Sequence, residues 1–228
     1  MILLRPLEIL HERFVFGRRV RQLATWLEPL LPRNASVLDV GCGDGRLAQA
    51  ILTLRPDLRF VGTDSRLRGQ APFPIYRAVG SALPHSESAI DAVLLVDVLH
   101  HTREPSNVIA EAARVARTCI VIKDQTRDTR TAGWILRFMD LVGNARHAVD
   151  LPFNYWSTRE WEQAFLRHGL RIRTWIRDLP LYPWWAAWLF SGRVHCIIVL
   201  DPGVLPAGGG GRREASGRRF PDRPIQGI

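Results

Sequence analysis

Short apolar and β-branched runs alternate along this chain with longer segments that have helical periodicity. Each run is four to six residues long, as expected of strands buried on both faces of a sheet. The gaps between them fit helices at Asp44 to Leu54 and Pro105 to Ala116. Strands that alternate with helices predict a parallel α/β sheet with right-handed crossovers. The predicted strands are Ser36 to Val40, Arg59 to Thr63, Ala92 to Val96 and Cys119 to Lys123.

The two ends of the chain have different patterns. Apolar residues recur at helical spacing between Leu7 and Leu31, before Pro32, which predicts one or two helices ahead of the sheet. Further strands are expected at Leu170 to Arg177 and Val194 to Leu200. After Asp201 the chain is rich in glycine and charge, which predicts a disordered tail. We therefore expect lead-in helices at 1–35, one domain at 36–200 with an aromatic insertion at about 126–160, and a tail at 201–228.

A glycine-rich turn follows the first predicted strand, in the sequence VLDVGCGDGRL. Gly41, Gly43 and Gly45 allow a tight reversal that brings backbone amides close to a ligand, and the next helix offers its positive N-terminal end. Asp64 comes 19 residues after Gly45, at the end of the second strand. A carboxylate there can accept hydrogen bonds from both ribose hydroxyls. This pattern predicts an adenosine site.

The turn also carries acids, which bear on the kind of cofactor. A nicotinamide fingerprint has a third glycine where this chain has Arg46. Asp39 and Asp44 would repel a pyrophosphate but suit the sulfonium and ammonium groups of S-adenosylmethionine. The residues favour S-adenosylmethionine, while a nicotinamide or flavin site and a purely structural turn stay open.

Four segments in order resemble the class I methyltransferases of the methyltransferase type 11 group. They are VLDVGCGDGRLA, VGTDS, ALPHSESAIDAVLLVDVLHH and EAARVAR, and the resemblance covers about Ser36 to Asp124. It implies a Rossmann-like, seven-stranded, mostly parallel sheet with helices on both faces and an antiparallel last strand. It also implies S-adenosylmethionine as the cofactor, with its methionine part over Asp39, Gly41 and Gly43 and its ribose on Asp64.

The chain departs from the family beside the expected adenine. The family often has an aspartate just before the alanine of the LP pair, whereas this chain reads YRAVGSALP. Adenine recognition would then depend on backbone groups and on Ser81, Ala82 and Leu83. This departure keeps a noncatalytic cofactor-binding protein open as an alternative.

Candidate catalytic residues follow the fourth and fifth strands, at the edge where a methyl group would be presented. His100 and His101 are candidate bases, although packing at a helix start would also explain a histidine here, and only one of the two is expected to face the cofactor. Asp97 either lines the cofactor pocket or caps a helix. Asp124 is a third candidate base, and Lys123 beside it suggests either a surface salt bridge or a substrate contact.

Aromatic and polar residues downstream could form a roof over the acceptor or simply pack. They are Trp134, Met139, Asp140, Asn144, His147, Asn154, Tyr155 and Trp156. Trp184, Trp185 and Trp188 form a second aromatic group that could pack on the sheet, contact a partner or touch a membrane surface. The group is too short to span a bilayer.

Composition narrows the function classes. A hydrophobic content of 46% in 228 residues suits one core. Cys42, Cys119 and Cys196 lack the spacing of a zinc site, and no metal cluster is expected. The net charge of +9 is almost all arginine, since Lys123 is the single lysine. The base composition of the genome can explain this arginine content. A surface that binds polyanions is the alternative explanation.

We therefore predict an S-adenosylmethionine-dependent enzyme that methylates a small-molecule or lipid acceptor. RNA is the alternative acceptor: no NPPY-type tetrad is present, but the arginine content keeps it open. The N-terminal sequence meets charges too early for a signal peptide, so the expected location is the cytoplasm. The motifs specify neither the acceptor nor the oligomeric state.

Overall fold

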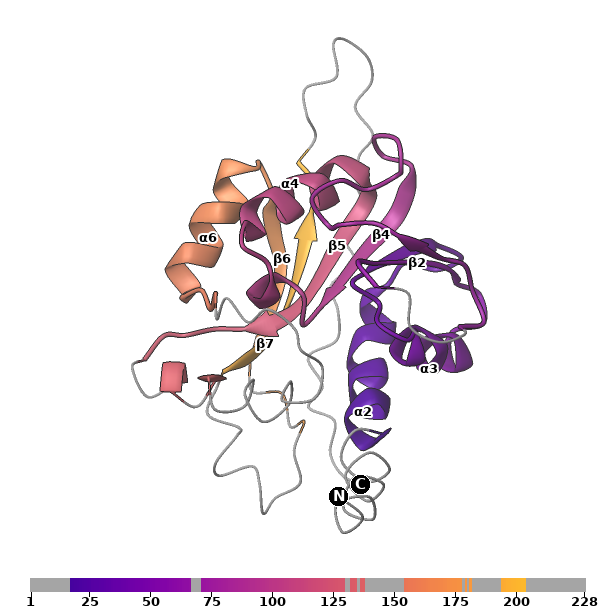
Figure 1. Ribbon diagram of the computed structural model, residues 1–228, viewed down its shortest axis with the longest axis horizontal. Helices are drawn as coiled ribbons and strands as arrows, with labels where there is room; N and C mark the ends of the chain where they lie inside the picture. The colour runs from indigo at the N-terminus through magenta and orange to yellow at the C-terminus, as the bar shows by residue number, and fades with distance from the viewer. Residues whose placement is uncertain are drawn as a thin grey trace.

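The protein is described by a computed structural model that covers residues 17–66, 71–129, 132–134, 136–137, 154–177, 179, 181 and 194–203. Its centre is a seven-stranded sheet in the order β3-β2-β1-β4-β5-β7-β6 (Figure 1). The neighbours β1 to β5 pair in parallel, whereas β7 runs antiparallel to both β5 and β6. The predicted α/β fold with an antiparallel last strand is confirmed.

The strand boundaries agree closely with the apolar runs. The parallel strands β1, β2, β4 and β5 cover Ser36–Val40, Arg59–Asp64, Ile90–Val96 and Ala116–Gln125. The late strands β6 and β7 cover Arg171–Arg177 and His195–Asp201. Sequence analysis missed β3, Ile75–Arg77, because three partly exposed residues after a proline carry no periodic signal.

The predicted helices between the strands are present, and each is one or two residues shorter than predicted. Helix α3 is Arg46–Leu54 and begins two residues later than predicted, because Gly45 in the left-handed region (φ 77°) still belongs to the turn. Helix α4 is Pro105–Val115, with the proline in its first turn, where no backbone N–H is needed. Of the lead-in region, the structure describes α2, Gly17–Leu27, and the short 3-10 helix η2, Glu28–Leu30.

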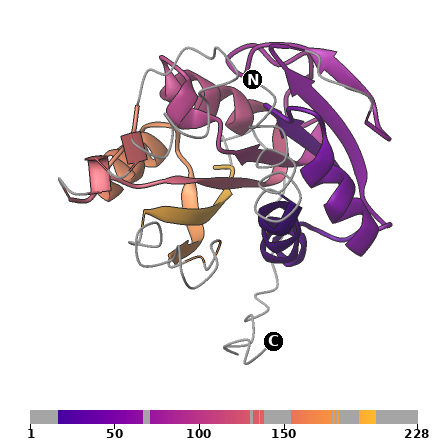
Figure 2. The same cartoon turned by 60° about the horizontal axis from the view of Figure 1, so that its bottom comes forward.

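Helices cover both faces of the sheet, as Figures 1 and 2 show. Alternate strand residues point to opposite faces, so each strand contributes to two cores. Leu38, Val93 and Ile120 pack with α4 on one face. Val37, Leu94 and Val121 pack with α2 and α3 on the other. The carboxyl ends of the central strands remain at one edge of the sheet.

Helix α6, Thr158–Arg167, was not predicted, although its start carries a capping box. The Ser157 side chain accepts a hydrogen bond from the Glu160 backbone N–H, and the Glu160 carboxylate accepts one from the Ser157 backbone. Trp161 and Phe165 face the sheet and stack with ring centroids 5.7 Å apart. The helix thus covers the late part of the sheet beside α4.

Several sequence predictions fall outside the described residues. They concern Trp184, Trp185 and Trp188, most of the tail, and Met139, Asp140, Asn144 and His147. Among the helices that the structure describes, none has the length and apolar character needed to cross a membrane.

The α6 contact gives a matched pair of stability predictions. Phe165 is 1% exposed and its neighbour Leu166 is 76% exposed. Phe165→Ala should lower the free energy of unfolding by about 3–5 kcal/mol, because it leaves a cavity against the sheet. Leu166→Ala should change it by less than about 0.5 kcal/mol. Urea denaturation measures both, and equal losses would contradict the packing of α6.

Candidate functional site

Four aspartates gather at the carboxyl edge of the central strands. Asp39 lies on β1, and Asp64 ends β2. Asp97 follows β4, and Asp124 is the second-last residue of β5. The parallel register sets Val40 beside Thr63 and Leu95, and Val96 beside Lys123. Neighbouring carboxylates repel one another, so each needs a compensating partner.

The glycine turn is folded back onto the end of β2. The backbone N–H groups of Gly41 and Cys42 donate to the Thr63 carbonyl at 2.7 and 3.1 Å. The Gly43 N–H donates to the Asp64 carboxylate at 2.9 Å, and the Arg66 N–H donates to its other oxygen at 2.8 Å. Asp64 is therefore fixed in orientation, and a carboxylate has further acceptor sites for a ligand.

Backbone conformation makes glycine necessary in this turn. Gly41, Gly43 and Gly45 all have positive φ, between 59° and 77°. A Cβ at Gly41 would lie 2.5 Å from Val98, whereas one at Gly43 would meet no described atom within 4 Å. The middle of the turn at Gly43 thus faces open space, where a ligand could approach the backbone.

Asp39 lies beneath this turn and is 3% exposed. Burial, with the charge of Asp64 as a second cause, raises the pKa of its carboxyl to about 7. No ion pair within the described residues involves Asp39. A cation beside a buried carboxyl stabilises the ionised form of that carboxyl. The residues of the turn therefore fit a positively charged ligand.

The segment expected beside the adenine forms a small closed loop. Val79 and Ala82 make an antiparallel bridge, and the Leu83 N–H donates to Glu111 of α4 at 2.9 Å. Ser81 and Ala82 are exposed, whereas Leu83 is buried. The loop thus offers exposed polar and backbone groups at Ser81 and Ala82, beside the buried Leu83.

Asp97 belongs to a partly buried ion-pair network. Its carboxylate binds the Lys123 ammonium on one oxygen and the Arg19 guanidinium, 2.6 Å away, on the other. Burial alone would raise the pKa of Asp97, but these two cations hold it well below its usual range. The prediction of a surface salt bridge at Lys123 was wrong, because its side chain is 0% exposed. Asp97 makes no helix-capping contact in the short helix that follows it.

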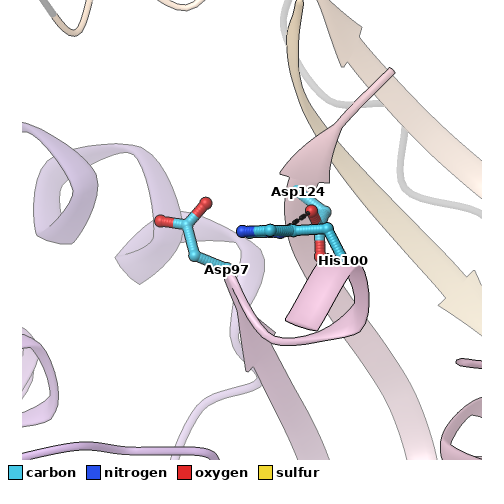
Figure 3. A group of neighbouring side chains, drawn as sticks. All are labelled: Asp97, His100 and Asp124. Atoms are coloured by element: carbon cyan, nitrogen blue, oxygen red, sulfur yellow. Dashed lines mark hydrogen bonds and ion pairs between the residues drawn. The ribbon is translucent and has the colours of Figure 1, made fainter. Parts of the chain in front are cut away.

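His100 and Asp124 form a second buried pair. His100 Nδ1 lies 2.6 Å from Asp124 Oδ1, with side chains 3% and 1% exposed. Asp124 also accepts hydrogen bonds from the backbone N–H groups of Leu99 and Gln125, at 3.0 and 2.9 Å. The carboxylate therefore orients the imidazole, and its other nitrogen points toward Asp97 (Figure 3). Such a pair can accept a proton at that second nitrogen.

His101 lies against His100 instead of turning away from it. The two histidines belong to the 3-10 helix η3, Leu99–His101, and their ring centroids are 3.9 Å apart. That only one of the two histidines faces the cofactor stays a prediction. Tyr155 stacks on His100 from a distant segment, with ring centroids 5.9 Å apart.

Asp97, His100 and Asp124 also satisfy the distance requirement for a metal site. One ligand atom from each lies within 4.8 Å of the others. However, the Lys123 ammonium already contacts Asp97. A divalent cation would have to displace that ammonium or suffer its repulsion, so the geometry suits proton transfer better than metal binding.

The structure thus brings the predicted residues to one edge, and it adds Arg19, which sequence analysis missed. Arg19 reaches Asp97 from α2, 78 residues away in the chain. No local motif marks this arginine among its neighbours Arg18 and Arg21. Only the packing of α2 against the sheet reveals its role.

Comparison with known proteins identifies this fold and site. The family described as "Methyltransferase domain" matches residues 10–174. The chain belongs to this methyltransferase family. The resemblance seen in the sequence is thereby confirmed, and with it the prediction of an S-adenosylmethionine-dependent methyltransferase.

A curated relative and two solved structures are similar to this methyltransferase. It is 28% identical over 160 residues to the ubiquinone biosynthesis O-methyltransferase of Hahella chejuensis (strain KCTC 2396), covering 64% of this chain and 62% of the relative. A chain from the complex between the Haloferax volcanii Trm112 methyltransferase activator and a methyltransferase has a TM-score of 0.64 at 14% identity, covering 85% of this chain and 93% of that one.

The second structure is geranyl diphosphate C-methyltransferase from Streptomyces coelicolor A3(2), in complex with Mg²⁺, geranyl diphosphate and S-adenosyl-L-homocysteine. Its TM-score is 0.58 at 16% identity, covering 79% of this chain and 78% of that one. These low identities establish the fold alone. S-adenosylmethionine is the cofactor of the family, and its cationic sulfonium suits the acidic turn of this methyltransferase.

Asp39 gives the ligand-free methyltransferase a specific pH dependence. The folded state raises its pKa from 3.8 to about 7, so it binds this proton more tightly than the unfolded chain. The stabilisation is complete below pH 3.8 and is lost as the pH rises to about 7. Wild type should therefore lose stability relative to Asp39→Asn over this range, by at most about 1.4 kcal/mol per pH unit. Chemical denaturation at several pH values measures the difference.

Asp57 provides a control, because its pKa is shifted in the opposite direction to that of Asp39. Hydrogen bonds, first from Arg55, hold the pKa of Asp57 below its usual range. Its contribution is present above the ordinary aspartate pKa and is lost as the pH falls. Between pH 3.8 and about 7, Asp57→Asn should therefore differ from wild type by a constant amount, and a slope of opposite sign should appear only below that range. The slope of Asp39→Asn appearing in both variants over the same range would contradict the assignment to Asp39.

Proposed function

We propose that this methyltransferase transfers the methyl group of S-adenosylmethionine to a hydroxyl of a small-molecule acceptor, with His100 as the general base. The His100–Asp124 pair carries this proposal. Its buried 2.6 Å contact fixes the imidazole at the sheet edge where the methyl group would be presented. Asp124 acts as the orienting residue and stabilises the charge that His100 acquires.

The cofactor would lie across the glycine turn. Its methionine part would lie over Asp39, Gly41 and Gly43, and its ribose would bind Asp64. Two backbone N–H groups fix the orientation of the Asp64 carboxylate. Gly45 completes the turn at the start of α3. The adenine would lie beside Ser81, Ala82 and Leu83. When bound, the cofactor supplies an electrophilic methyl on sulfur, so alignment of the acceptor can provide much of the acceleration.

The network around Asp97 has a supporting role in this proposal. Asp97 follows the strand end beside the cofactor site, but Lys123 and Arg19 neutralise it. It can thus shape the pocket without adding a further negative charge beside Asp39 and Asp64. Residues 36–200 would form the methyltransferase domain, with 1–35 as a lead-in region and 201–228 as a tail.

A small-molecule acceptor is supported by two relatives. One is named as an O-methyltransferase of ubiquinone biosynthesis, and the other holds geranyl diphosphate. The chain spans 62% of the length of the curated relative. The acceptor of that relative is therefore not assigned to this chain. The histidine base favours an acceptor that must lose a proton, such as a phenol or an enol.

Asp64 tests the cofactor site. Asp64→Ala removes the proposed ribose acceptor and should weaken S-adenosylhomocysteine binding by about 10- to 100-fold, the value of one or two hydrogen bonds to a charged group. Isothermal titration calorimetry measures the affinity. Asp91→Ala, at the opposite end of the sheet beside Ser36, should leave it unchanged. Undiminished affinity in Asp64→Ala would overturn the site.

His100 tests the chemistry. His100→Gln should lower kcat by about 100- to 10,000-fold while S-adenosylhomocysteine affinity stays near that of wild type. The defect should shrink as the pH approaches the acceptor's own pKa, because an ionised acceptor no longer needs a base. A pH series of initial rates with a phenolic acceptor measures this.

His168→Gln is the matched control for His100. His168 Nε2 lies 2.8 Å from the Ser106 hydroxyl. Its replacement should leave both kcat and the pH profile unchanged. A pH-independent loss in His100→Gln would indicate a packing role and exclude the proposed base.

A further inference from the structure

A cavity lies just beyond the end of β5, and one of its lining residues, Tyr155, stacks on the proposed base His100. Its volume is about 640 Å³, within the range of small-molecule sites. Two described helical pieces, 132–134 and 136–137, form one side of it. The lining residues are Arg127, Asp128, Thr129, Gly133, Trp134, Arg137 and Tyr155.

The acid in this lining already has partners. The Asp128 carboxylate accepts hydrogen bonds from the backbone N–H and the hydroxyl of Thr158, both at 2.7 Å. The Arg177 guanidinium lies 3.5 Å from it. Two hydrogen bonds from Thr158, which does not line the cavity, therefore orient the Asp128 carboxylate.

The two arginines give the cavity its positive character. Arg127 pairs with Glu160 only at 3.9 Å, and both side chains are about half exposed, at 47% and 48%. The same Glu160 oxygen is held by the backbone and hydroxyl of Ser157, each at 2.7 Å. An exposed pair at this distance contributes little, so an anion can compete for Arg127. Arg137 lines the same space.

Aromatic rings supply the apolar part of the lining. Trp134 is 74% exposed, although tryptophan is a large side chain that usually buries most of its surface. Tyr155 is 4% exposed, and its hydroxyl donates to the Leu136 carbonyl at 3.1 Å, which fixes the ring. The Tyr155 ring also stacks on His100, so one ring contacts both the cavity and the proposed base.

The spacing relates the arginine to the base. Arg127 follows Asp124 by three residues, and three extended residues span at most about 10 Å. A molecule that lies against Tyr155 could place one end at Arg127 and the other near His100. RNA fits this arrangement less well, because the cavity has the size of one small molecule.

We infer that this cavity binds the methyl acceptor and that the acceptor is an organic acid. It would have an aromatic or prenyl body on Trp134 and Tyr155, and a carboxylate or phosphate on Arg127 and Arg137. This inference rests on the proposed function, and it adds the substrate class. A guanidinium suits both anions because its fork matches two oxygens.

Calorimetry on the protein saturated with S-adenosylhomocysteine tests the inference. The probes are a hydroxynaphthoic acid, its uncharged carboxamide and the corresponding hydroxynaphthyl phosphate. The two anions should bind about 10- to 100-fold more tightly than the carboxamide, as expected for a charge-assisted hydrogen bond. Comparison of the two anions then distinguishes a carboxylate site from a phosphate site.

Variants assign the preference to residues. Arg127→Gln and Arg137→Gln should each reduce the preference for the anions without changing S-adenosylhomocysteine affinity. Trp134→Ala should weaken all three probes equally. Arg59→Gln, on the exposed start of β2, is the matched control and should bind like wild type. Thermal unfolding checks that each variant remains folded.

The failures are distinguishable. Equal binding of acid and carboxamide, or a preference that survives both arginine variants, overturns the organic-acid site while leaving methyl transfer intact. Tighter binding of a short RNA than of every probe also overturns it. Failure of the wild type to bind S-adenosylhomocysteine contradicts the proposed function itself.

Discussion

The structure depends on how four carboxylates are tolerated at one edge of a parallel sheet. The register of β1, β2, β4 and β5 brings Asp39, Asp64, Asp97 and Asp124 to that edge. Backbone amides hold Asp64, and Lys123 and Arg19 neutralise Asp97. Each compensation differs, and this difference divides one edge into the proposed ribose acceptor Asp64, a structural ion pair at Asp97 and the proposed base beside Asp124.

Asp39 is the exception among the four, and it explains why the edge suits a cation. Its burial raises the pKa to about 7, so the free protein holds this carboxyl close to its midpoint at neutral pH. A positively charged ligand would favour its ionised form, and binding and deprotonation would reinforce each other. If Lys123 lay beside Asp39 instead of Asp97, this advantage would vanish. The single lysine therefore lies between two proposed parts of the edge. Asp39 and Asp64 belong to the proposed cofactor side, and His100 and Asp124 belong to the proposed acceptor side.

Sequence patterns predicted the parts of the site that depend on local structure. The five residues of β1 were predicted to the residue, and the turn with Asp64 follows from glycine and strand spacing alone. The Asp97–Lys123–Arg19 network was not predicted, because its members come from three separate elements and only packing joins them. The His100–Asp124 contact was missed for the same reason, although both residues were named as candidates. Residues on one element are thus predictable, and partners across elements are not.

The proposed acceptor side of the site consists of residues from different elements. The shared fold alone therefore does not specify the substrate. The lining residues Arg127, Trp134, Arg137 and Tyr155 come from segments beyond the shared strand–helix units. The bridge between Thr126 and Trp156 and the hydrogen bond from Tyr155 to the Leu136 carbonyl bring these segments together. Substitutions there can alter charge and shape without disturbing the glycine turn or the core. Family membership therefore predicts the methyl donor, whereas the proposed acceptor class depends on the arginines and rings beside β5.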